Sequence, residues 1–536
     1  MRKIVIFALI QCFATSCNDK TIEPETPSGN GEHSAADNAN TRVPKYQGAF
    51  LYGSNMGYKS NWDDKDIADA LAGNASGSIE GIGVNSLRPA LYEDFVETWG
   101  YGIRVETFNY YKTIGAINNT VFIGDRPSDA HREKKQYAQG MASESYENLY
   151  EPIWDNGEND TPVNDKNYYA LYVYKVAKAY GNVKFWEIKN EPDFTYSGAG
   201  DKVAGEQGNW WDNDPRPADL SNWKAPIQSY IRLLRVSYEV IKHVNPDSYI
   251  CVGGIGYSSF LDAILRNTDN PDGGKVTGAY PQKGGAWFDC LSYHIYPMYH
   301  LRSWAGTGFR HYRNSDDAAA TVIDRKNTMF SLMAKYGYGA EYPAKEVIIT
   351  EVNVPSKSVS GYLGSQETQR NFAIKLAVLS QVNGIAGVYI YGAWDGQEAN
   401  SSSTDPFDYM GLYKPLPNRP GQQLRPNESG IAWRTMTSLI GDYRYNATQT
   451  AILNLPSTVE GAAFYSDKVK DYIYVLWAKT SEKDMSEDAS VEYTFPAAIG
   501  ANNIFYKQWD NNKFSVTGSR ITLKGDPFFI KVNSSF

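Results

Sequence analysis

Three observations predict that this sequence folds as an α/β protein, a (β/α)8 TIM barrel followed by a small all-β sandwich. Short apolar runs, each followed by a polar loop and then by a helical pattern or a long loop, recur eight times between residues 46 and 440. Strands that alternate with helices pair in parallel, and eight such units fit a closed barrel. Between residues 441 and 536 the helical period gives way to short runs of alternating polarity, which is typical of a sandwich.

The expected barrel strands are short and rich in apolar or β-branched residues. They cover residues 49–54, 84–89, 120–124, 183–189, 249–253, 290–296, 347–352 and 388–393. Amphipathic segments between them predict helices that include residues 168–180, 227–244, 320–336 and 366–381. A doubly wound parallel sheet is the competing architecture, but no glycine-rich phosphate loop follows the first run, so the eightfold count favours the barrel.

The expected sandwich strands follow one another at short spacing. They cover residues 461–466, 472–479, 490–495, 503–509, 520–524 and 528–533. Trp477 and Trp509 lie in these runs among apolar neighbours. This pattern favours a domain that packs against the barrel and supports it, with a ligand-binding module as the alternative.

The first residues have the pattern of an export signal. Two basic residues precede an apolar run over residues 4–10, and small residues lead to Cys17. This pattern predicts a signal peptide over residues 1–16. Cys17 after small residues resembles the lipobox of bacterial lipoproteins, which implies a lipidated amino terminus, with an ordinary secretory signal as the alternative. Residues 17–45 are polar and rich in Pro, Gly and Ser, and we expect a disordered tether there.

The amino-terminal pattern also predicts where the protein acts. We expect an exported protein that is lipid-anchored at the bacterial outer membrane, at the cell surface or, alternatively, on the periplasmic side. No later segment offers about 18 uninterrupted apolar residues, the length that would predict a membrane-spanning helix. The lipid anchor is therefore the expected contact with the membrane.

The composition excludes one class of partner and suggests another. Lys and Arg number 52 and Asp and Glu number 61, which leaves a net charge of −9. We therefore expect no nucleic-acid partner, because nothing would neutralise phosphates over a broad surface. Aromatic residues make up 14% of the chain, and their flat apolar faces suit sugar rings, although large cores also use them. We expect a monomer.

Cys251 and Cys290 lie in apolar runs that predict strands. An exported chain can pair two cysteines in a disulfide. Two buried free thiols, which behave as small hydrophobic residues, are the alternative. The apolar surroundings favour free thiols.

Two of the expected strands end in a glutamate. Alternation along the fourth strand puts Glu187, Lys189 and Glu191 on one face until the strand ends, and Pro192, which cannot donate to a ladder, marks that end. The seventh strand ends in the same way at Glu351. Barrel active sites are built at the carboxyl ends of the strands. A salt bridge at the rim would explain either glutamate alone, but it does not easily explain both at equivalent ends.

Asn190, Glu191 and Pro192 on the fourth strand, together with Glu351 on the seventh, resemble the motif of clan A of the retaining glycoside hydrolases. The resemblance covers the barrel in order and spacing. It implies that Glu191 is the general acid/base, that Glu351 is the nucleophile and that the substrate is a β-linked polysaccharide or oligosaccharide. The agarase- and porphyranase-like family 86, families 39 and 30 and the β-1,3-glucanases share the layout of barrel, sandwich and anchor.

Four further positions match the same clan. His294 and Tyr296 at the end of the sixth strand resemble its His-x-Tyr motif, whose tyrosine donates a hydrogen bond to the nucleophile. Arg88 at the end of the second strand resembles the arginine that keeps the nucleophile ionised. Trp394 after the eighth strand resembles the platform under the sugar at the cleavage point. Each residue alone has a packing or rim-charge alternative, and together, on the expected strands, they favour the clan.

The residues also suit this chemistry on physical grounds. Two carboxyl groups about 5–5.5 Å apart let one attack while the other donates a proton, which gives a covalent glycosyl-enzyme and net retention. Asn190 is placed to donate a hydrogen bond to the 2-hydroxyl of the sugar. No zinc-ligand spacing occurs, and we expect no metal or other cofactor. A non-catalytic surface glycan-binding protein on the same scaffold is the alternative.

The loops expected at the active mouth are long and rich in aromatic residues. Trp210 and Trp211 follow the fourth strand and Trp304 follows the sixth, and we expect all three to bind substrate. Loops this long in a compact domain are usually functional, so we expect an extended cleft and endo action. Three arginines after the sixth strand favour an anionic or sulfated glycan, although nearby acidic residues can neutralise them.

Overall fold

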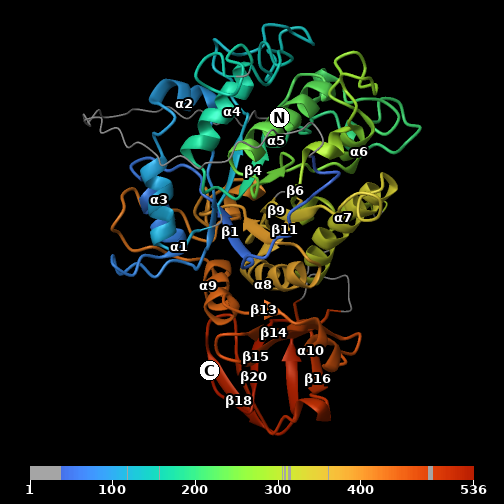
Figure 1. Ribbon diagram of the computed structural model, residues 1–536. Helices are drawn as coiled ribbons and strands as arrows, with labels where there is room; N and C mark the ends of the chain where they lie inside the picture. Colours follow the sequence, from blue (N-terminus) through green and yellow to red (C-terminus); the bar gives the residue numbers. More distant parts are fainter. Residues whose placement is uncertain are drawn as a thin grey trace. The chain divides into compact units, whose positions relative to one another are not determined.

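Eight parallel strands close into a barrel (Figure 1). In chain order they are β1 (Leu51–Asn55), β2 (Ser86–Arg88), β3 (Thr120–Ile123), β4 (Phe185–Ile188), β5 (Tyr249–Cys251), β6 (Cys290–Ile295), β9 (Glu346–Val352) and β12 (Gly387–Ile390). They pair in the order β2-β1-β12-β9-β6-β5-β4-β3. A parallel bridge between Ala90 and Phe122 joins β2 to β3 and closes the ring. The predicted fold class is confirmed, and each strand lies within a few residues of its expected position.

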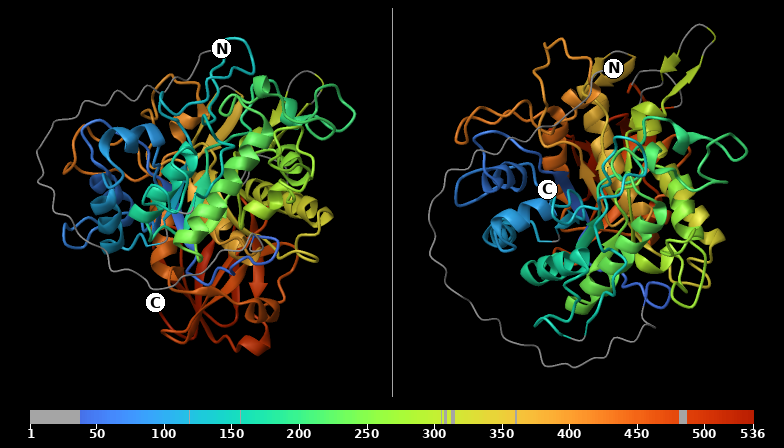
Figure 2. Two further views of the ribbon diagram at one scale, coloured as in Figure 1. Left: turned by 45° about the horizontal axis from the view of Figure 1, so that its top comes forward. Right: turned by 90° about the horizontal axis from the view of Figure 1, so that it is seen from above.

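At least one helix follows each barrel strand and packs outside the barrel, so the helices surround the strands (Figure 2). Polar side chains cap the first turns of some of these helices: Asp63 accepts hydrogen bonds from the backbone of Lys65 and Asp66, and Ser365 accepts one from Thr368. In chain order the helices are α1 (Asp64–Ala72), α2 (Glu93–Trp99), α3 (Val105–Thr113), α4 (Tyr168–Ala179), α5 (Ile227–Val244), α6 (Ser258–Arg266), α7 (Ser315–Lys335), α8 (Gln366–Val382) and α9 (Glu428–Ile440).

Short elements lie in the loops, most of them at the carboxyl end of the barrel, whereas the 3-10 turn over Gly284–Trp287 precedes a barrel strand at the amino end. Two hairpins follow β6 and β9, namely β7 (Arg302–Trp304) with β8 (Phe309–His311) and β10 (Lys357–Val359) with β11 (Tyr362–Ser365). Single 3-10 turns are η1 (Ala199–Asp201), η2 (Pro217–Asp219), η3 (Gly284–Trp287), η4 (Pro297–Tyr299), η5 (Pro406–Tyr409) and, in the carboxyl-terminal domain, η6 (Ala497–Ile499).

The structure is a computed structural model that describes residues 38–536 apart from residues 118, 156, 305, 307–308, 312–314, 360 and 481–486. For residues 302–304, 309–311 and 363 the backbone alone is described. The predicted signal peptide and the predicted lipidation site Cys17 lie outside the described residues.

The structure corrects the prediction of a disordered tether for residues 38–45. Ala39 is buried, and its N–H donates to the carbonyl of Ala286 at 2.9 Å. The ammonium group of Lys345, buried just before β9, donates to the carbonyl of Ala39 at 3.2 Å and to that of Phe288 at 2.9 Å. A buried ammonium group needs acceptors, so this segment is ordered by backbone contacts that its polar composition does not reveal.

Cys251 and Cys290 occupy opposite positions in the neighbouring strands β5 and β6. Both are buried and both are free. The two cysteines are therefore the free thiols that their apolar surroundings favoured.

A β domain follows the barrel. Its main sheet has the order β13-β14-β15-β20-β17-β18, and β16 pairs with β19 in a second, two-stranded sheet. The strand β18, whose side chains are mostly exposed, was not expected, and neither was the short helix α10. The elements are β13 (Arg444–Tyr445), α10 (Ala447–Ile452), β14 (Val459–Ser466), β15 (Asp471–Ala478), β16 (Ser490–Thr494), β17 (Asn503–Lys507), β18 (Lys513–Thr517), β19 (Arg520–Lys524) and β20 (Phe528–Val532).

The central strand β15 explains how this domain attaches to the barrel. Ile473, Val475 and Trp477 pack in the same apolar cluster as the barrel core, whereas Tyr474 and Leu476 pack in the core of the β domain itself. Because successive side chains point to opposite faces, a strand buried on both sides must be apolar throughout. This is the reason for the continuous apolar run in the sequence, and it supports the interpretation of the β domain as a buttress.

A buried ionic group joins the β domain to two barrel helices. Lys375 of α8 has no solvent exposure and lies 3.1 Å from Asp316 Oδ1 and 3.9 Å from Glu487 Oε2. Asp316, in the first turn of α7, also accepts the indole N–H of Trp477 at 2.8 Å. The cation of the barrel is thus neutralised in part by a carboxylate of the β domain, so the two parts stabilise each other.

Replacing Asp316 by Ala should destabilise the protein by about 3–5 kcal/mol, because Lys375 would keep its buried charge and lose its nearest counter-ion. Urea unfolding measures the effect. The matched control is Asp442→Ala, which breaks an exposed pair with Lys468 and should leave the midpoint unchanged. Equal midpoints for the two variants would contradict a supporting role for this ionic group.

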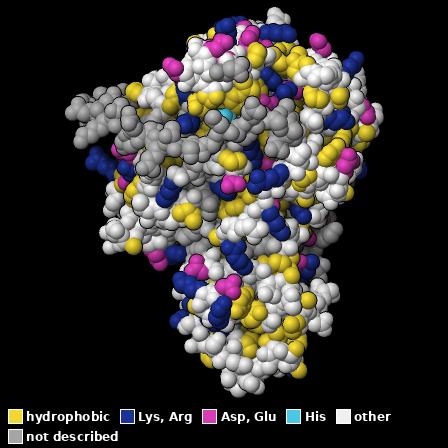
Figure 3. All heavy atoms as spheres, in the orientation of Figure 1, with side chains coloured by type: hydrophobic (Ala, Val, Ile, Leu, Met, Phe, Trp, Pro, Cys, Tyr) yellow, Lys and Arg dark blue, Asp and Glu magenta, His cyan; other side chains and the backbone are white. Residues whose placement is uncertain are grey.

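Charged side chains of both signs lie on the described surface. On the face drawn in Figure 3, basic and acidic side chains are interspersed. Within the part of the chain that the structure describes, no helix combines the length and the apolar character needed to cross a bilayer.

Candidate active site

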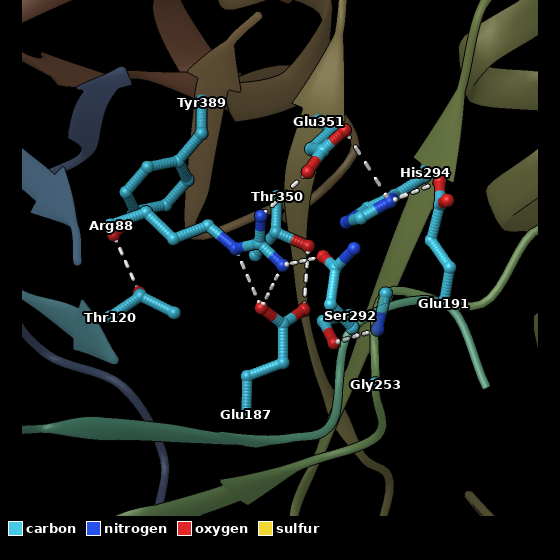
Figure 4. Close-up of polar contacts among 12 residues, drawn as sticks. Arg88, Thr120, Glu187, Glu191, Gly253, Ser292, His294, Thr350, Glu351 and Tyr389 are labelled. Carbon is cyan, nitrogen blue, oxygen red and sulfur yellow. Dashed lines mark hydrogen bonds and ion pairs between the residues drawn. The ribbon is translucent and has the colours of Figure 1, made fainter. Parts of the chain in front are cut away.

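Five of the predicted site residues meet at the carboxyl end of the barrel, four of them drawn in Figure 4. Arg88 ends β2, His294 lies near the end of β6 and Glu351 lies near the end of β9. Glu191 and Tyr296 follow β4 and β6. The ends of parallel barrel strands share one rim, so residues separated by 263 positions in the chain come into hydrogen-bond contact.

Glu351 is held as an anion through both carboxylate oxygens. Arg88 Nη1 donates to Oε1 at 2.7 Å and the Tyr296 hydroxyl donates to Oε2 at 2.7 Å. Burial by itself raises the pKa of Glu351, but the charges of His294 and Arg88 and the hydrogen bonds from Tyr296 and Arg88 outweigh it, so the pKa lies below its ordinary value. Glu351 is therefore charged at neutral pH.

A β-bulge aims Glu351 into the barrel. In the pairing of β9 with β6 the register shifts between Tyr293 and His294, so that Thr350 has no partner residue in β6. The hydroxyl of Thr350 and the carboxylate of Glu351 both make hydrogen bonds in the barrel interior. Regular alternation would turn one of two successive residues outward, and the extra residue of the bulge removes that constraint.

The turn after β4 positions Glu191. β4 ends at Ile188, and Lys189 (φ 68°) and Glu191 (φ 48°) both adopt the left-handed backbone conformation. The Glu191 N–H donates to the carbonyl of Gly253 at 2.6 Å. A Cβ atom on Gly253 would lie 2.7 Å from the ring of Pro192, so the close packing of these two loops requires glycine at this position.

The structure corrects the expectation that Glu187, Lys189 and Glu191 share one face. Lys189 Nζ donates to the carbonyl of Gly124 at 3.1 Å and pairs with Asp125 at 3.1 Å. The side chain of Glu187 contacts Arg88 instead. A left-handed residue rotates the chain out of the pleat, so the period of two ends at Ile188 rather than at Pro192.

His294 connects the two carboxyl groups. Its Nδ1 lies 2.8 Å from Glu191 Oε1 and 3.8 Å from Glu351 Oε2. Burial lowers the pKa of His294, but the charge of Glu351 and the hydrogen bond and charge of Glu191 outweigh this effect. The pKa of His294 therefore lies above its ordinary value. One oxygen of each glutamate and a ring nitrogen of His294 all lie within 4.8 Å of one another. Glu191 has the more exposed side chain, 25% against 11% for Glu351.

Two groups of described residues have the types and spacing of metal ligands. At the site itself, Arg88 Nη1 lies 2.7 Å from Glu351 and brings a positive charge close to the place that a cation would take. The other group surrounds Glu93 in α2, whose carboxylate accepts a hydrogen bond from Ser128 and lies 2.5 Å from His131 Nδ1. Protein contacts thus already satisfy the central carboxylate of each group.

Arg88 connects more residues than the sequence led us to expect. Its Nε donates to Glu187 at 2.7 Å, Nη1 to Asn55 at 2.9 Å and Nη2 to the amide oxygen of Asn190 at 2.7 Å. Because the guanidinium holds this oxygen, the orientation of the Asn190 side-chain amide is fixed. The sequence analysis predicted no role for Asn55 or Glu187. The feature that could have revealed them is a polar side chain within an otherwise apolar strand.

Aromatic rings pack beside the carboxyl pair. Tyr296 lies edge-on to Phe407 and Tyr391, with ring centroids 4.8 Å and 5.8 Å away. Burial and the charge of Glu351 raise the pKa of Tyr296, so its hydroxyl stays protonated and donates. Tyr391, which follows β12 and was not predicted, has its pKa raised by burial and then by the charges of Glu351 and Glu191.

Trp394 follows β12 at the same rim and is half-buried. Gly57, which follows β1, packs against its ring, since a Cβ atom there would lie 3.0 Å from the indole. This contact fixes the orientation of the ring and leaves part of it accessible. The proposed role of Trp394 as a sugar platform is compatible with this position.

The structure corrects the prediction that Trp210 binds substrate. Trp210 is 1% exposed and packs against Tyr257 with ring centroids 5.6 Å apart, so it has no open face for a sugar. The aromatic loop composition did not distinguish loop packing from substrate stacking. Trp211 is half-buried and donates its indole N–H to the carbonyl of Lys202 at 3.1 Å. The side chain of Trp304, like those of the loop arginines after β6, lies outside the described residues.

No protein-family model matches the chain, and no curated protein matches it. Among solved structures, the chain is similar to the glucosidase from Croceicoccus marinus, with 12% identity, a TM-score of 0.49 and coverage of 92% of this chain and 97% of that one. It is similar to the monomeric β-xylosidase from Caulobacter crescentus CB15, with 11% identity, a TM-score of 0.49 and coverage of 92% of this chain and 97% of that one. It is also similar to the α-L-arabinofuranosidase from Thermotoga maritima, with 13% identity, a TM-score of 0.48 and coverage of 91% of this chain and 97% of that one. Similarities this distant carry no argument about function.

Proposed function

We propose that this protein is a retaining glycoside hydrolase that cleaves β-glycosidic bonds in a polysaccharide by double displacement. One observation carries the proposal. Glu351, held as an anion by Arg88 and Tyr296, faces the more exposed Glu191 across His294, with one oxygen of each glutamate within 4.8 Å. Two carboxyl groups this close suit direct attack by one of them, whereas inverting enzymes space them more widely to admit a water molecule.

In the first step Glu351 attacks the anomeric carbon while the bond between that carbon and the glycosidic oxygen breaks. Glu191 gives its proton to the leaving oxygen. The amide nitrogen of Asn190 donates to the 2-hydroxyl of the sugar, a contact that strengthens in the transition state. Arg88 and Tyr296 hold the attacking carboxylate in place.

In the second step water attacks the anomeric carbon of the glycosyl-enzyme, in which the sugar is joined to Glu351 by an ester bond. Glu191, now a carboxylate, takes a proton from that water, the ester bond breaks, and Glu351 returns to its charged form. The two displacements leave the sugar with its starting anomeric configuration. His294 Nδ1, 2.8 Å from Glu191, keeps that side chain oriented in both steps.

We extend the proposal to endo action in an extended cleft. The long loops after β4 and β12 and the accessible part of Trp394 at the rim support it, because long loops in a compact domain are usually functional. The lipobox-like sequence at Cys17 supports export and anchoring at the bacterial outer membrane, with the barrel acting on glycans outside the cytoplasm.

A screen of marine and plant polysaccharides, followed by reducing-end release, tests the proposed function. The expected result is release from at least one β-linked polymer, with products that carry the β-anomer first when they are followed by NMR. Binding of a glycan without release would instead favour a non-catalytic glycan-binding protein. Release of the α-anomer first would contradict retention.

Tyr296→Phe should move the acid limb of the pH profile of kcat/KM to higher pH. The hydroxyl stabilises the Glu351 anion, so its loss raises the pKa of Glu351, and the active carboxylate becomes protonated at a higher pH as the pH falls. Above the limb, kcat/KM should fall by about 10–100-fold, because Glu351 loses a contact that orients its carboxylate for attack.

Tyr293→Phe is the matched control. Its hydroxyl lies on the same strand and donates to the carbonyl of Val322 at 3.0 Å, away from both carboxyl groups. This variant should keep the acid limb of the wild type. An unchanged limb in Tyr296→Phe as well would show that this hydroxyl does not stabilise the reacting carboxylate.

A further inference from the structure

We infer that Glu187 is a positioning residue that fixes Arg88 between two carboxylates and thereby keeps Glu351 reactive as a nucleophile. The inference rests on the proposed function. Glu187 does not reach the mouth of the barrel and would not touch the sugar, because it is fully buried beneath Arg88 and Thr350 (Figure 4). Its effect on the reaction would pass through Arg88.

Both oxygens of Glu187 are committed to the residues around the nucleophile. Oε2 accepts from Arg88 Nε at 2.7 Å and also lies 2.7 Å from Nη2. Oε1 accepts from the hydroxyl of Thr350 at 2.7 Å. Thr350 directly precedes Glu351 in the bulge of β9, so Glu187 is tied both to the arginine and to the strand segment that carries the nucleophile.

The guanidinium of Arg88 has no freedom to approach Glu351 more closely. Nε and Nη2 are held on the side of Glu187, and Nη1 is shared between Glu351 and the amide oxygen of Asn55. The ring of Phe122 lies 4.6 Å from the centre of the guanidinium and packs against it. A planar guanidinium anchored through two of its nitrogens keeps its orientation, which a single contact would not ensure.

The charges explain why this arrangement favours reaction. A lone guanidinium facing Glu351 would stabilise its carboxylate so strongly in the resting enzyme that attack becomes harder, because charges interact strongly when buried. With Glu187 present, two buried carboxylates share the one guanidinium, so Glu351 keeps more of its basicity. A buried ion pair is weak evidence for stability, because apolar replacements are often as stable. The charge of Glu187 acts on Glu351 through the guanidinium that the two carboxylates share.

Several other ionisable side chains of the described residues face the two carboxylates. The ionisable groups that face Glu351 are Arg88 from β2, Glu191 after β4, His294 and Tyr296 at the end of β6, and Tyr391 after β12. Those near Glu187 are Arg88, Tyr230 in α5 and Cys251 in β5.

Glu187→Gln tests the inference, because it removes the charge and keeps the shape: the amide oxygen can accept from Arg88 while the amide nitrogen donates to the Thr350 hydroxyl. Loss of the negative charge should lower the pKa of Glu351 further, so the acid limb of kcat/KM should move to lower pH. The rate of glycosylation should fall by about tenfold or more, because a less basic carboxylate attacks more slowly. A fall in the rate with no movement of the acid limb of kcat/KM would mean that Glu187 has only a structural role, and it would overturn the inference. A variant with the wild-type rate and the wild-type pH profile would overturn it as well.

Two further variants separate charge from shape. Thr350→Val removes the hydrogen bond to Glu187 without changing any charge, so the acid limb should stay in place. Glu187→Asp keeps the charge on a shorter side chain, and it should restore the wild-type limb even where kcat is reduced. If the Gln variant does not fold, the Asp variant still decides, since a displaced limb in Glu187→Asp would contradict the inference.

A measurement that needs no turnover separates this inference from the proposed function. The carboxyl carbon resonance of Glu351, assigned by its absence from Glu351→Gln, can be titrated in the wild type and in Glu187→Gln. A lower titration midpoint in the variant supports the charge coupling, and an equal midpoint overturns it. If the wild type releases no reducing ends from any glycan, the proposed function fails, whatever the titration shows.

Discussion

Glu351→Gln should lower kcat/KM on any hydrolysed polysaccharide by about 10⁴–10⁶-fold, the scale of the loss when a covalent nucleophile is removed. The amide cannot attack the anomeric carbon, although its oxygen can still accept from Arg88 while its nitrogen donates to the oxygen of the Tyr296 hydroxyl. Arg88 keeps Glu187 as its counter-ion at 2.7 Å, so we expect the fold to survive. Reducing-end assays with circular dichroism on the same samples measure both effects.

Glu346→Gln is the control for this substitution. Glu346 begins the same strand, β9, at the opposite end of the barrel, where its side chain accepts the N–H of Tyr46 at 3.1 Å. The control should retain wild-type turnover. Near-complete activity in Glu351→Gln would mean that another residue is the nucleophile.

Glu191→Ala should lose most activity on polysaccharide and keep much of its glycosylation rate on an aryl glycoside with a good leaving group. Protonation of the leaving oxygen matters less as the leaving group becomes more acidic. Breakdown of the glycosyl-enzyme should then be slow, because nothing takes the proton from the incoming water. Added azide should restore turnover and give a β-glycosyl azide.

The structure explains why a small anion fits the variant. The side chain of Glu191 is 25% exposed, so its removal opens a space that solvent can reach. The Nδ1 of His294, 2.8 Å from the lost carboxylate, remains to hold an anion there. Attack from this side, opposite to Glu351, fixes the β configuration of the product.

Glu191→Gln is the matched control, because its amide fills the space and should prevent rescue. Product configuration is read by NMR. An α-configured azide formed with Glu351 intact would indicate an inverting mechanism or a different nucleophile. Equal rescue of both variants would show that azide does not act in the space left by this carboxylate.

The sequence alone determined the fold class and singled out two glutamates that the structure brings close together. Eight apolar runs separated by amphipathic segments fix a parallel barrel, because burial on both sides of a strand and on one face of a helix leaves a residue-by-residue pattern. Glu191 and Glu351 stand out because a carboxylate that ends a buried strand is costly without a partner. Both signals are local, and both were sufficient to locate the rim of the barrel.

The tertiary structure decided how the side chains meet. The bulge at Thr350 and the left-handed turn at Lys189 both break the alternation on which strand reasoning depends. The contact of Arg88 with Glu187 joins residues 99 positions apart, and no local pattern records it. Burial of Trp210 depended in the same way on neighbours distant in sequence. Periodicity encodes which face is buried, whereas barrel closure determines which buried polar groups become partners.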